Sequence, residues 1–288
     1  MQQFTVLLEP DLYLFLKDIR TATKAIEHLL YLSPREETLY ITQVTMTPHV
    51  TGNVSVPTHR PDRIFQHLAC FFPGLLALGV HLLPSDILST DEKFKHLTAA
   101  EGLTQACFKT YADQPSGLGP DYVRFDGPYE TAETLDSTLS VDEFEKMYRW
   151  LPKYEAWVRN GRIGNAPGIH PVEIEDGSSW WKKLARGHKK RKDARRDYQI
   201  ANKAYLLRPE TVESFYVLWR VTGDEIWRAY GWEVFKAIDR SAKLRVRSHV
   251  KGGDVYAYAS VSDVTKERRF GTNAWLKDEM PSYFLAET

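Results

Sequence analysis

The sequence lacks an excess of charge of either sign. Its 288 residues include 38 lysines and arginines and 38 aspartates and glutamates, so the formal net charge at pH 7 is zero. A protein that binds nucleic acid or an anionic membrane with its whole surface needs a basic excess, because it must neutralise phosphate charges. The composition argues against that class, and we expect no nucleic-acid partner.

Long hydrophobic runs are also missing. The longest one, Leu68–Leu83, is interrupted by a proline, two glycines and a histidine, and it is too short to cross a bilayer. The N-terminal residues contain no basic start followed by an apolar run and a small-residue cleavage site. We therefore predict a buried helix for this run, with no transmembrane segment and no signal peptide in this chain.

Cysteine is scarce, since the chain contains only Cys70 and Cys107. Two cysteines leave both free buried thiols and a disulfide open. The sequon Asn53-Val54-Ser55 is an equally weak signal of glycosylation. Both features fit a secretory compartment, provided that other residues place the chain there.

Apolar and aromatic residues are plentiful. Hydrophobic residues make up 43% of the chain, which is enough for a sizeable core and argues against global disorder. The 8 tryptophans and 15 tyrosines either fill that core or stack on sugars at a surface.

The spacing of the apolar residues predicts a mainly α protein made of helical hairpins with short β-strands. Helices are predicted over Leu12–Leu32, Ile64–Leu83 with a break at Pro73-Gly74, Asp91–Tyr111, Arg208–Thr222, Glu225–Lys243 and from Asp278 onward. Extended segments are predicted over Thr38–Val44 and Gly253–Val264, and a loop over residues 45–62. Asp91 and Asp224 are the expected N-terminal caps, and Gly223 is the expected C-terminal stop.

A long middle region, residues 127–200, shows no repeat and is predicted to be an insertion within one domain that covers residues 1–288. It contains a basic block, Lys182–Arg196, with nine lysines or arginines and one aspartate. Such a block is either a solvated surface segment or a site for RNA, lipid headgroups or an import receptor. Trp180 and Trp181 precede the block and are candidates to anchor the insertion on the body of the protein.

Candidate chemistry centres on the helix predicted after Arg208. Glu210 and Glu213 lie three residues apart in its first turn, so they project on one side. The helix N-terminus stabilises their negative charge, and an ionised carboxylate beside a cavity can take a proton from water. Arg208 can hold either carboxylate or a sugar hydroxyl. Acidic first turns are also common for structural reasons, and a lone histidine on an apolar helix, such as His67, is usually a core residue.

Four groups of short strings occur in order along the chain. They are HLACF at 67–71 with PG at 73–74 and LALG at 76–79; Cys107 to Tyr111 with GLGPD at 117–121; LLRPETVES at 206–214 with RVTGD at 220–224 and GW at 231–232; and YASV at 258–261 with DEM at 278–280 and ET at 287–288. These strings resemble motifs of glycoside hydrolase family 47, the class I calcium-dependent α-1,2-mannosidases, and the third group is very specific. The resemblance covers residues 60–125 and 200–288, whereas the first 60 residues and the middle region match poorly.

The resemblance implies a partial (α/α) barrel of helical hairpins, with a sugar site in its bore and a calcium ion at its bottom. It implies hydrolysis, with inversion, of terminal α-1,2-linked mannose from high-mannose N-glycans in the endoplasmic reticulum or Golgi lumen. In that assignment Glu210 is the general base, and Cys70 and Cys107 form the family's disulfide. The substrate-binding residues are His67, Asp121, Arg208 and Glu213.

Departures from the family pattern set the remaining expectations. The family's general-acid glutamate belongs to a region outside this chain, and its catalytic aspartate has no secure counterpart here. Asp121 and Pro281 stand where the family has glutamates, and the family's calcium-binding threonine would lie beyond Thr288. We therefore expect no metal ligands in this chain, weak or absent calcium binding, and little activity from the chain by itself.

Two other functions stay open on the sequence. A mannosidase-like protein without turnover could recognise glycans or unfolded chains in endoplasmic reticulum quality control. A helical scaffold could instead use the basic block for salt-sensitive nucleic-acid binding.

Overall fold

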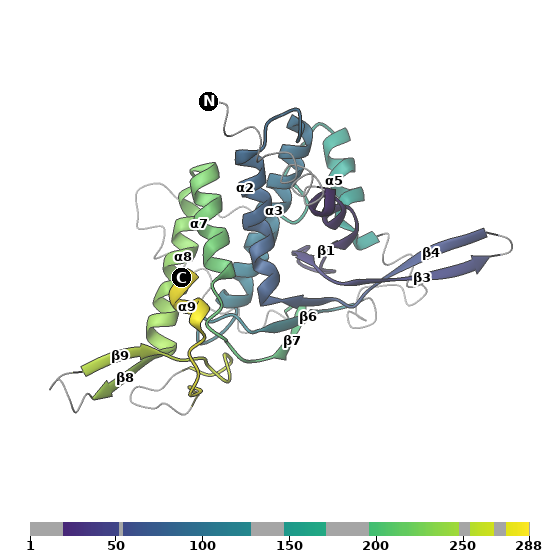
Figure 1. Cartoon of the computed structure of the whole chain (residues 1–288). Helices are drawn as coiled ribbons and strands as arrows, with labels where there is room; N and C mark the ends of the chain where they lie inside the picture. The colour runs from purple at the N-terminus through teal and green to yellow at the C-terminus, as the bar shows by residue number, and fades with distance from the viewer. Residues whose placement is uncertain are drawn as a thin grey trace, which may run out of the picture.

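The computed structural model describes residues 20–51, 54–127, 147–170, 196–247, 254–267 and 275–287. Four helices form the body: α2 (Phe71–Leu82), α3 (Thr90–Ala112), α7 (Glu210–Thr222) and α8 (Glu225–Ser241). They stand side by side, with short strands gathered towards one end (Figure 1). The predicted mainly α class, with helical hairpins and short strands, is confirmed.

The smaller elements connect and flank these helices. Residues 20–29 are helical, and the other short helices are η1 (His67–Cys70), α5 (Trp150–Arg159) and α9 (Ser282–Glu287). The strands are β1 (Leu30–Leu32), β2 (Leu39–Ile41), β3 (Val44–Thr51), β4 (Val54–Pro61), β5 (Ile64–Gln66), β6 (Tyr122–Phe125), β7 (Tyr198–Asn202), β8 (Lys243–Arg247) and β9 (Asp254–Tyr258). None of the described helices is both long and apolar enough to pass through a lipid bilayer.

The long apolar run forms α2, but the predicted break at Pro73-Gly74 is wrong. Ile64–Gln66 is strand β5, and the helix begins only at Phe71. Pro73 therefore lies in the first turn, where the helix has no use for its missing N–H group. The proline marks the start of one continuous helix rather than a kink within a longer one.

Gly74 allows α2 to approach α7 closely. The Ser214 hydroxyl of α7 accepts a hydrogen bond from the Gly74 N–H group at 2.9 Å and donates one to the Cys70 carbonyl oxygen at 2.5 Å. A Cβ atom on Gly74 would lie 2.8 Å from Ser214 Oγ and 3.2 Å from Ser214 Cα. Because the Cα atom belongs to a helix backbone, the neighbour cannot simply rotate away, and the contact requires glycine.

Gly74→Ala is expected to lower the free energy of unfolding by about 1–3 kcal/mol, because the added methyl group forces α2 and α7 apart. Gly79→Ala in the same helix is the matched control, since a Cβ atom there would meet only Leu83 Cδ1 at an ordinary 3.6 Å. The control should raise the stability by about 0.5–1 kcal/mol through helix propensity. Urea unfolding of both variants measures the difference, and equal shifts in the same direction would contradict the close-approach argument.

Helix α3 begins with a different cap from the predicted Asp91. The Ser89 hydroxyl accepts a hydrogen bond from the Glu92 N–H group at 3.4 Å, and the Glu92 carboxylate accepts one from the Ser89 N–H group at 3.0 Å. This reciprocal capping box uses a serine three residues before a glutamate. Asp91 lies inside the first turn instead, where its negative charge interacts favourably with the helix dipole.

The predicted hairpin of α7 and α8 is confirmed. Gly223 ends α7 in the left-handed conformation with φ 72°, which costs glycine no steric penalty. Asp224 then caps α8 by accepting a hydrogen bond from the Ile226 N–H group at 2.9 Å. The three-residue turn thus carries the stop and the start signal for two packed helices.

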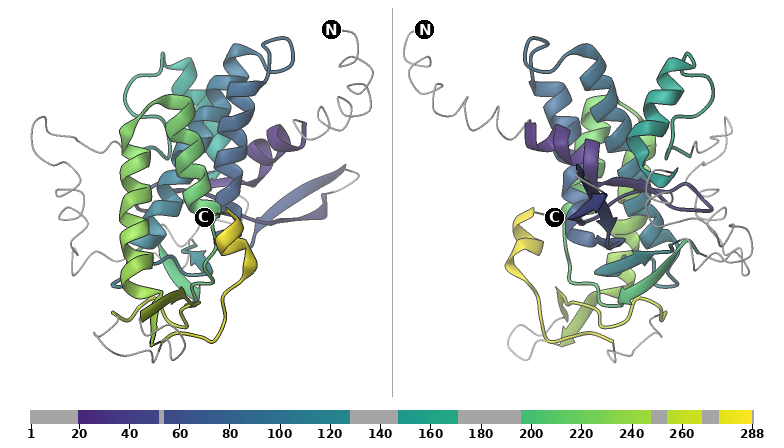
Figure 2. Two further views of the ribbon diagram at one scale, coloured as in Figure 1. Left: turned by 60° about the vertical axis from the view of Figure 1, so that its left-hand side comes forward. Right: turned by 90° about the vertical axis from the view of Figure 1, so that its right-hand side faces the viewer.

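The loop predicted over residues 45–62 is wrong, because this stretch forms the antiparallel hairpin β3–β4. Its register places Pro48 opposite Pro57. In a two-stranded sheet each strand has one unpaired edge, so a proline without an N–H group is tolerated. The hairpin projects away from the helices (Figures 1 and 2). Asn53 of the sequon lies outside the described residues.

Several predicted boundaries shift. The helix predicted from Leu12 is described from residue 20 and stops at residue 29, where β1 begins, and the last helix starts at Ser282 rather than Asp278. The strand predicted over Thr38–Val44 is shorter than expected, since β2 covers only Leu39–Ile41 and Val44 already belongs to β3. Of the extended segment predicted over Gly253–Val264, only Asp254–Tyr258 is strand, as β9.

The middle region contributes two described elements to the body of the molecule. Trp150 of α5 is fully buried in the main hydrophobic core, and its Nε1–H donates to the Pro167 carbonyl oxygen at 2.8 Å. Strand β7 pairs with β6. The boundaries predicted for the insertion stay a prediction, because much of it, including both candidate anchoring tryptophans and the basic block except Arg196, lies outside the described residues.

Strands β5, β6 and β7 form an antiparallel sheet that positions the site described below. His67 directly follows β5, Asp121 directly precedes β6, and Asn202 ends β7. In the sheet register, Gln66 lies opposite Tyr122, and Tyr122 lies opposite Asn202. The end of β5, the start of β6 and the end of β7 therefore lie at the same end of one small sheet.

Helix α2 has an apolar face that no described residue covers. Its sequence contains no charged residue, and one side packs into the core through Phe72, Leu76 and Ala77. The other side, together with Leu68 of η1, exposes a row of large apolar residues at alternating spacings of three and four: Leu68, Phe71, Leu75, Leu78 and Leu82. A helix that is apolar all round is normally buried on all sides. Within the described residues, this row therefore has no packing partner.

Candidate functional site

His67 lies at the centre of a buried polar cluster at the foot of α2. Its side chain is 3% exposed, and its Nε2 atom hydrogen-bonds the Tyr111 hydroxyl and lies 3.4 Å from the Thr211 hydroxyl. The rings of Tyr111 and Tyr205 pack against the imidazole, with centroids 5.4 and 6.1 Å away. His67 therefore belongs to an ordered polar site within the apolar surroundings that the sequence suggested.

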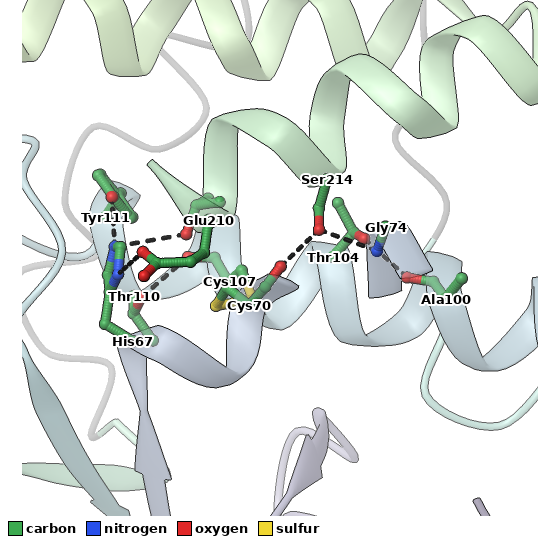
Figure 3. The surroundings of a disulfide bond; sticks show 11 residues. His67, Cys70, Gly74, Ala100, Thr104, Cys107, Thr110, Tyr111, Glu210 and Ser214 are labelled. Carbon is green, nitrogen blue, oxygen red and sulfur yellow. Dashed lines mark hydrogen bonds and ion pairs between the residues drawn. A yellow bond between two sulfur atoms is a disulfide. The ribbon is translucent and has the colours of Figure 1, made fainter. Parts of the chain in front are cut away.

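Glu210 faces the opposite edge of the same imidazole. Its Oε2 atom lies 3.6 Å from His67 Nδ1, and both atoms are buried without a hydrogen-bond partner. Its Oε1 atom lies 3.7 Å from an Arg208 guanidinium nitrogen. Figure 3 shows Glu210, His67 and Tyr111 pointing toward one another beside the disulfide. The carboxylate is thus only 8% exposed but retains an unused acceptor atom.

The backbone before α7 turns Arg208 and Glu210 into the site. Leu207 has φ 56°, in the left-handed region that a branched side chain rarely adopts. Its side chain is fully buried in the main core, which holds this conformation against a cost of about 1–3 kcal/mol. Strain of this kind at the entrance of a helix is typical of functional sites.

Asp121 holds Arg208 in place. Its Oδ1 atom accepts a hydrogen bond from Arg208 Nε at 3.0 Å, and its Oδ2 atom accepts one from Asn202 Nδ2 at 3.1 Å. Partial burial acts to lower the pKa of Arg208, but the hydrogen bond and charge of Asp121 outweigh it and raise that pKa. The guanidinium is therefore a fixed positive charge between two carboxylates.

Glu213 lies three residues after Glu210 in α7. It is half-buried and shares the first turn with Glu210, as the spacing predicted. The structure thus brings His67, Asp121, Arg208 and Glu210 together, with Glu213 on the same helix turn. A direct sugar contact by any of them stays a prediction, and Asp121 has both oxygens engaged by protein groups.

A disulfide supports the site. Cys70 at the end of η1 and Cys107 in α3 are bonded, with their Cα atoms 6.1 Å apart. The pairing expected from the family resemblance is confirmed, and both cysteines are buried. The bond fixes the start of α2 to α3 a single helical turn from Tyr111 (Figure 3).

Sequence reasoning did not assign Tyr111, Thr211, Asn202 or Tyr205 to the site. Two of them had a usable signal. Tyr111 is four residues after Cys107 in a helix, so the two share one face, and Thr211 directly follows Glu210. Asn202 and Tyr205 had none, because Asn202 is placed by the pairing of β7 with β6 and Tyr205 by a backbone bridge to Val261.

The described residues contain no cluster of acidic, histidine or cysteine side chains of the kind that holds a metal ion. No three His, Cys, Asp or Glu side chains in these stretches lie close enough together to hold a metal ion. Calcium takes six to eight oxygen ligands, mostly carboxylates and carbonyls. The weak calcium binding expected from the sequence stays a prediction.

Comparisons with known proteins bear on the family and the fold of the chain. The family model described as "Glycosyl hydrolase family 47" matches residues 5–288, a wider span than the motifs indicated. "Mannosyl-oligosaccharide 1,2-alpha-mannosidase MNS3" of Arabidopsis thaliana is 28% identical over 77% of this chain and 27% of its own length. The human "Endoplasmic reticulum mannosyl-oligosaccharide 1,2-alpha-mannosidase" is 26% identical over 77% of this chain and 20% of its own length.

One solved structure shows the same fold. The "alpha-1,2-mannosidase from Trichoderma reesei" superposes with a TM-score of 0.53 at 23% identity, covering 97% of this chain and 41% of that chain. The chain spans about a quarter of the length of the curated relatives it matches. The likeness supports the partial (α/α) barrel predicted from the sequence.

Proposed function

Because the chain belongs to glycosyl hydrolase family 47, we propose that the Arg208–Glu210 site acts in hydrolysis of terminal α-1,2-linked mannose from N-glycan oligosaccharides. The observation that carries this proposal is the unpartnered Glu210 Oε2 atom, which is buried 3.6 Å from His67 Nδ1. A buried acceptor that makes no hydrogen bond within the protein is available to a water molecule or a sugar hydroxyl.

Glu210 is the general base of the proposed reaction. An inverting glycosidase uses one carboxylate to take a proton from the attacking water, on the face of the sugar opposite the leaving group. Arg208, 3.7 Å away, and the N-terminus of α7 both stabilise the ionised carboxylate that this step requires. The second carboxyl group of an inverting pair is not assigned to any described residue.

The neighbouring groups bind and orient the sugar. Arg208 offers its remaining N–H groups to mannose hydroxyls, while Asp121 keeps the guanidinium in position. His67 and Glu213 complete the polar lining that we propose for high-mannose N-glycans.

The family, one similar protein and the disulfide bear on the cofactor and on the cellular compartment. Family 47 enzymes are generally calcium-dependent. One similar protein bears an endoplasmic reticulum name, and a buried disulfide is typical of oxidising compartments. We therefore infer an endoplasmic reticulum or Golgi lumen as the place of action.

Mannose release from a high-mannose N-glycan tests the proposed chemistry. Glu210→Gln keeps the size of the side chain but removes the base, so the rate should fall by about 10²–10⁴-fold. Glu225→Gln is the matched control, because Glu225 is a first-turn glutamate of the adjacent α8 that pairs with exposed Arg228. Equal loss in both variants would contradict a specific role for Glu210.

A non-catalytic glycan-binding protein is the second candidate, because Arg208, held by Asp121, and Glu210 can bind a sugar without a second catalytic carboxyl group. Calorimetric titration with an α-1,2-linked mannobiose separates the two functions. Binding that Arg208→Ala weakens, without mannose release, favours glycan recognition. If the chain neither binds the mannobiose nor releases mannose, both proposed functions are overturned.

A further inference from the structure

His67 presents its two ring nitrogens to different kinds of partner. Nε2 hydrogen-bonds the Tyr111 hydroxyl and lies 3.4 Å from the Thr211 hydroxyl, whereas Nδ1 lies 3.6 Å from Glu210 Oε2. The ring is 3% exposed, so bulk water does not compete for either nitrogen. The position of the imidazole proton therefore decides what the Glu210 carboxylate faces.

The two neutral tautomers differ sharply in this respect. With the proton on Nδ1, an N–H group points at the carboxylate, and Nε2 is free to accept a hydrogen bond. With the proton on Nε2, a lone pair faces the negative carboxylate, and the two repel each other. The group that supplies a donor to Nε2 consequently selects the favourable arrangement.

Tyr111 is suited to be that donor. Complete burial raises the pKa of its hydroxyl well above the ordinary value, so the hydroxyl keeps its proton. The ring has a defined place, because a Cβ atom on Gly119 would lie 2.5 Å from Tyr111 Cε2. Gly119 leaves room for the ring. The disulfide at Cys107, one turn before Tyr111, anchors α3.

We propose that Tyr111 is a positioning residue that holds His67 in the Nδ1–H tautomer, so that an N–H group faces the Glu210 carboxylate. The hydrogen bond that Tyr111 donates to Nε2 removes the freedom of the imidazole to exchange its proton position. The Nδ1–H group then faces Glu210 Oε2 and orients the carboxylate. The benefit of this orientation for a general base rests on the proposed function, whereas the tautomer itself does not.

Nuclear magnetic resonance of the full chain with ¹⁵N-labelled histidine tests the proposal directly. Protonated and unprotonated ring nitrogens have well-separated ¹⁵N resonances, and His67 is assigned through its contacts to the Tyr111 and Tyr205 rings. The wild-type protein should show a protonated Nδ1 and an unprotonated Nε2. The opposite pattern in the wild-type protein would overturn the proposal without any variant.

Tyr111→Phe then tests the cause. It removes only the hydroxyl, and His67 should change from one tautomer to a mixture. Tyr230→Phe is the matched control, because Tyr230 is equally buried but stacks on Phe108, away from His67. An unchanged Nδ1–H tautomer in folded Tyr111→Phe would show that Tyr111 does not select it.

Turnover provides a separate measurement. If the chain releases mannose, Tyr111→Phe should lower kcat by about 10–100-fold with little change in KM, a loss of the size found for partners that orient metal-binding histidines. Absence of mannose release in the wild-type protein would contradict the proposed hydrolysis, but it would leave the tautomer result unaffected.

Discussion

Replacing both Cys70 and Cys107 with alanine is expected to lower the free energy of unfolding by about 4 kcal/mol. The bond closes a loop of sequence separation 37, and the entropy that such a loop removes from the unfolded chain amounts to about 4 kcal/mol. The cysteines also lie in a second core cluster with Phe65, Val123 and Phe125. Loss of the bond should therefore loosen the contact between α2, α3 and the sheet.

Guanidinium unfolding of the double variant and of the oxidised wild-type protein measures this effect. The wild-type protein with reducing agent should approach the stability of the double variant, because both lack the same crosslink. A double variant within about 1 kcal/mol of the oxidised protein would contradict the loop-closure argument. In that case the unfolded chain would already be restricted near the two cysteines.

Asp197→Ala is expected to lower the free energy of unfolding by about 3–5 kcal/mol, because it removes a fully buried acceptor that is shared by the partly buried Arg35 guanidinium and by nearby hydroxyl and N–H donors. Asp197 is fully buried directly before β7. Its carboxylate accepts hydrogen bonds from Ser33 Oγ at 2.6 Å, Arg35 Nε at 2.7 Å and the Glu36 N–H group at 2.6 Å. The carboxylate thus ties the turn between β1 and β2 to the sheet that carries Asn202.

Asp91→Ala is the matched control for this substitution. The Asp91 side chain is 95% exposed, and its closest cation, Arg162, lies 3.7 Å away. Removal of such a surface pair should change stability by less than about 0.5 kcal/mol. Thermal unfolding compares the two variants, and a loss as small for Asp197→Ala as for Asp91→Ala would show that the Arg35 network is not stabilising.

The elements that were predictable have local causes. The hairpin of α7 and α8 follows from Gly223 and Asp224, whose side chains determine backbone conformation and hydrogen bonding within a few residues. The first turn of α7 likewise places Glu210 and Glu213 on one side by helical geometry alone. Such signals act before any distant part of the chain is in place.

Each wrong sequence prediction arose where the same residues are compatible with two local structures. Pro73 reads equally well as a helix breaker and as a first-turn residue, and only the preceding strand β5 decides between them. Ser89 and Asp91 are both good caps, and the position of Glu92 selects Ser89. The prolines of β3 and β4 suggested a loop because their tolerance depends on each strand having a free edge.

By itself, the sequence determined the helical class, the α7–α8 hairpin, the acidic first turn after Arg208 and, through family motifs, the pairing of Cys70 with Cys107. Only the tertiary structure decided that His67, Asp121 and Glu210 converge, and that Tyr111 lies behind the imidazole. The physical reason is that these contacts join β5, β6, α3 and α7 across long sequence separations. Their geometry depends on strand register and on the packing of glycines against neighbouring side chains, which no local pattern encodes.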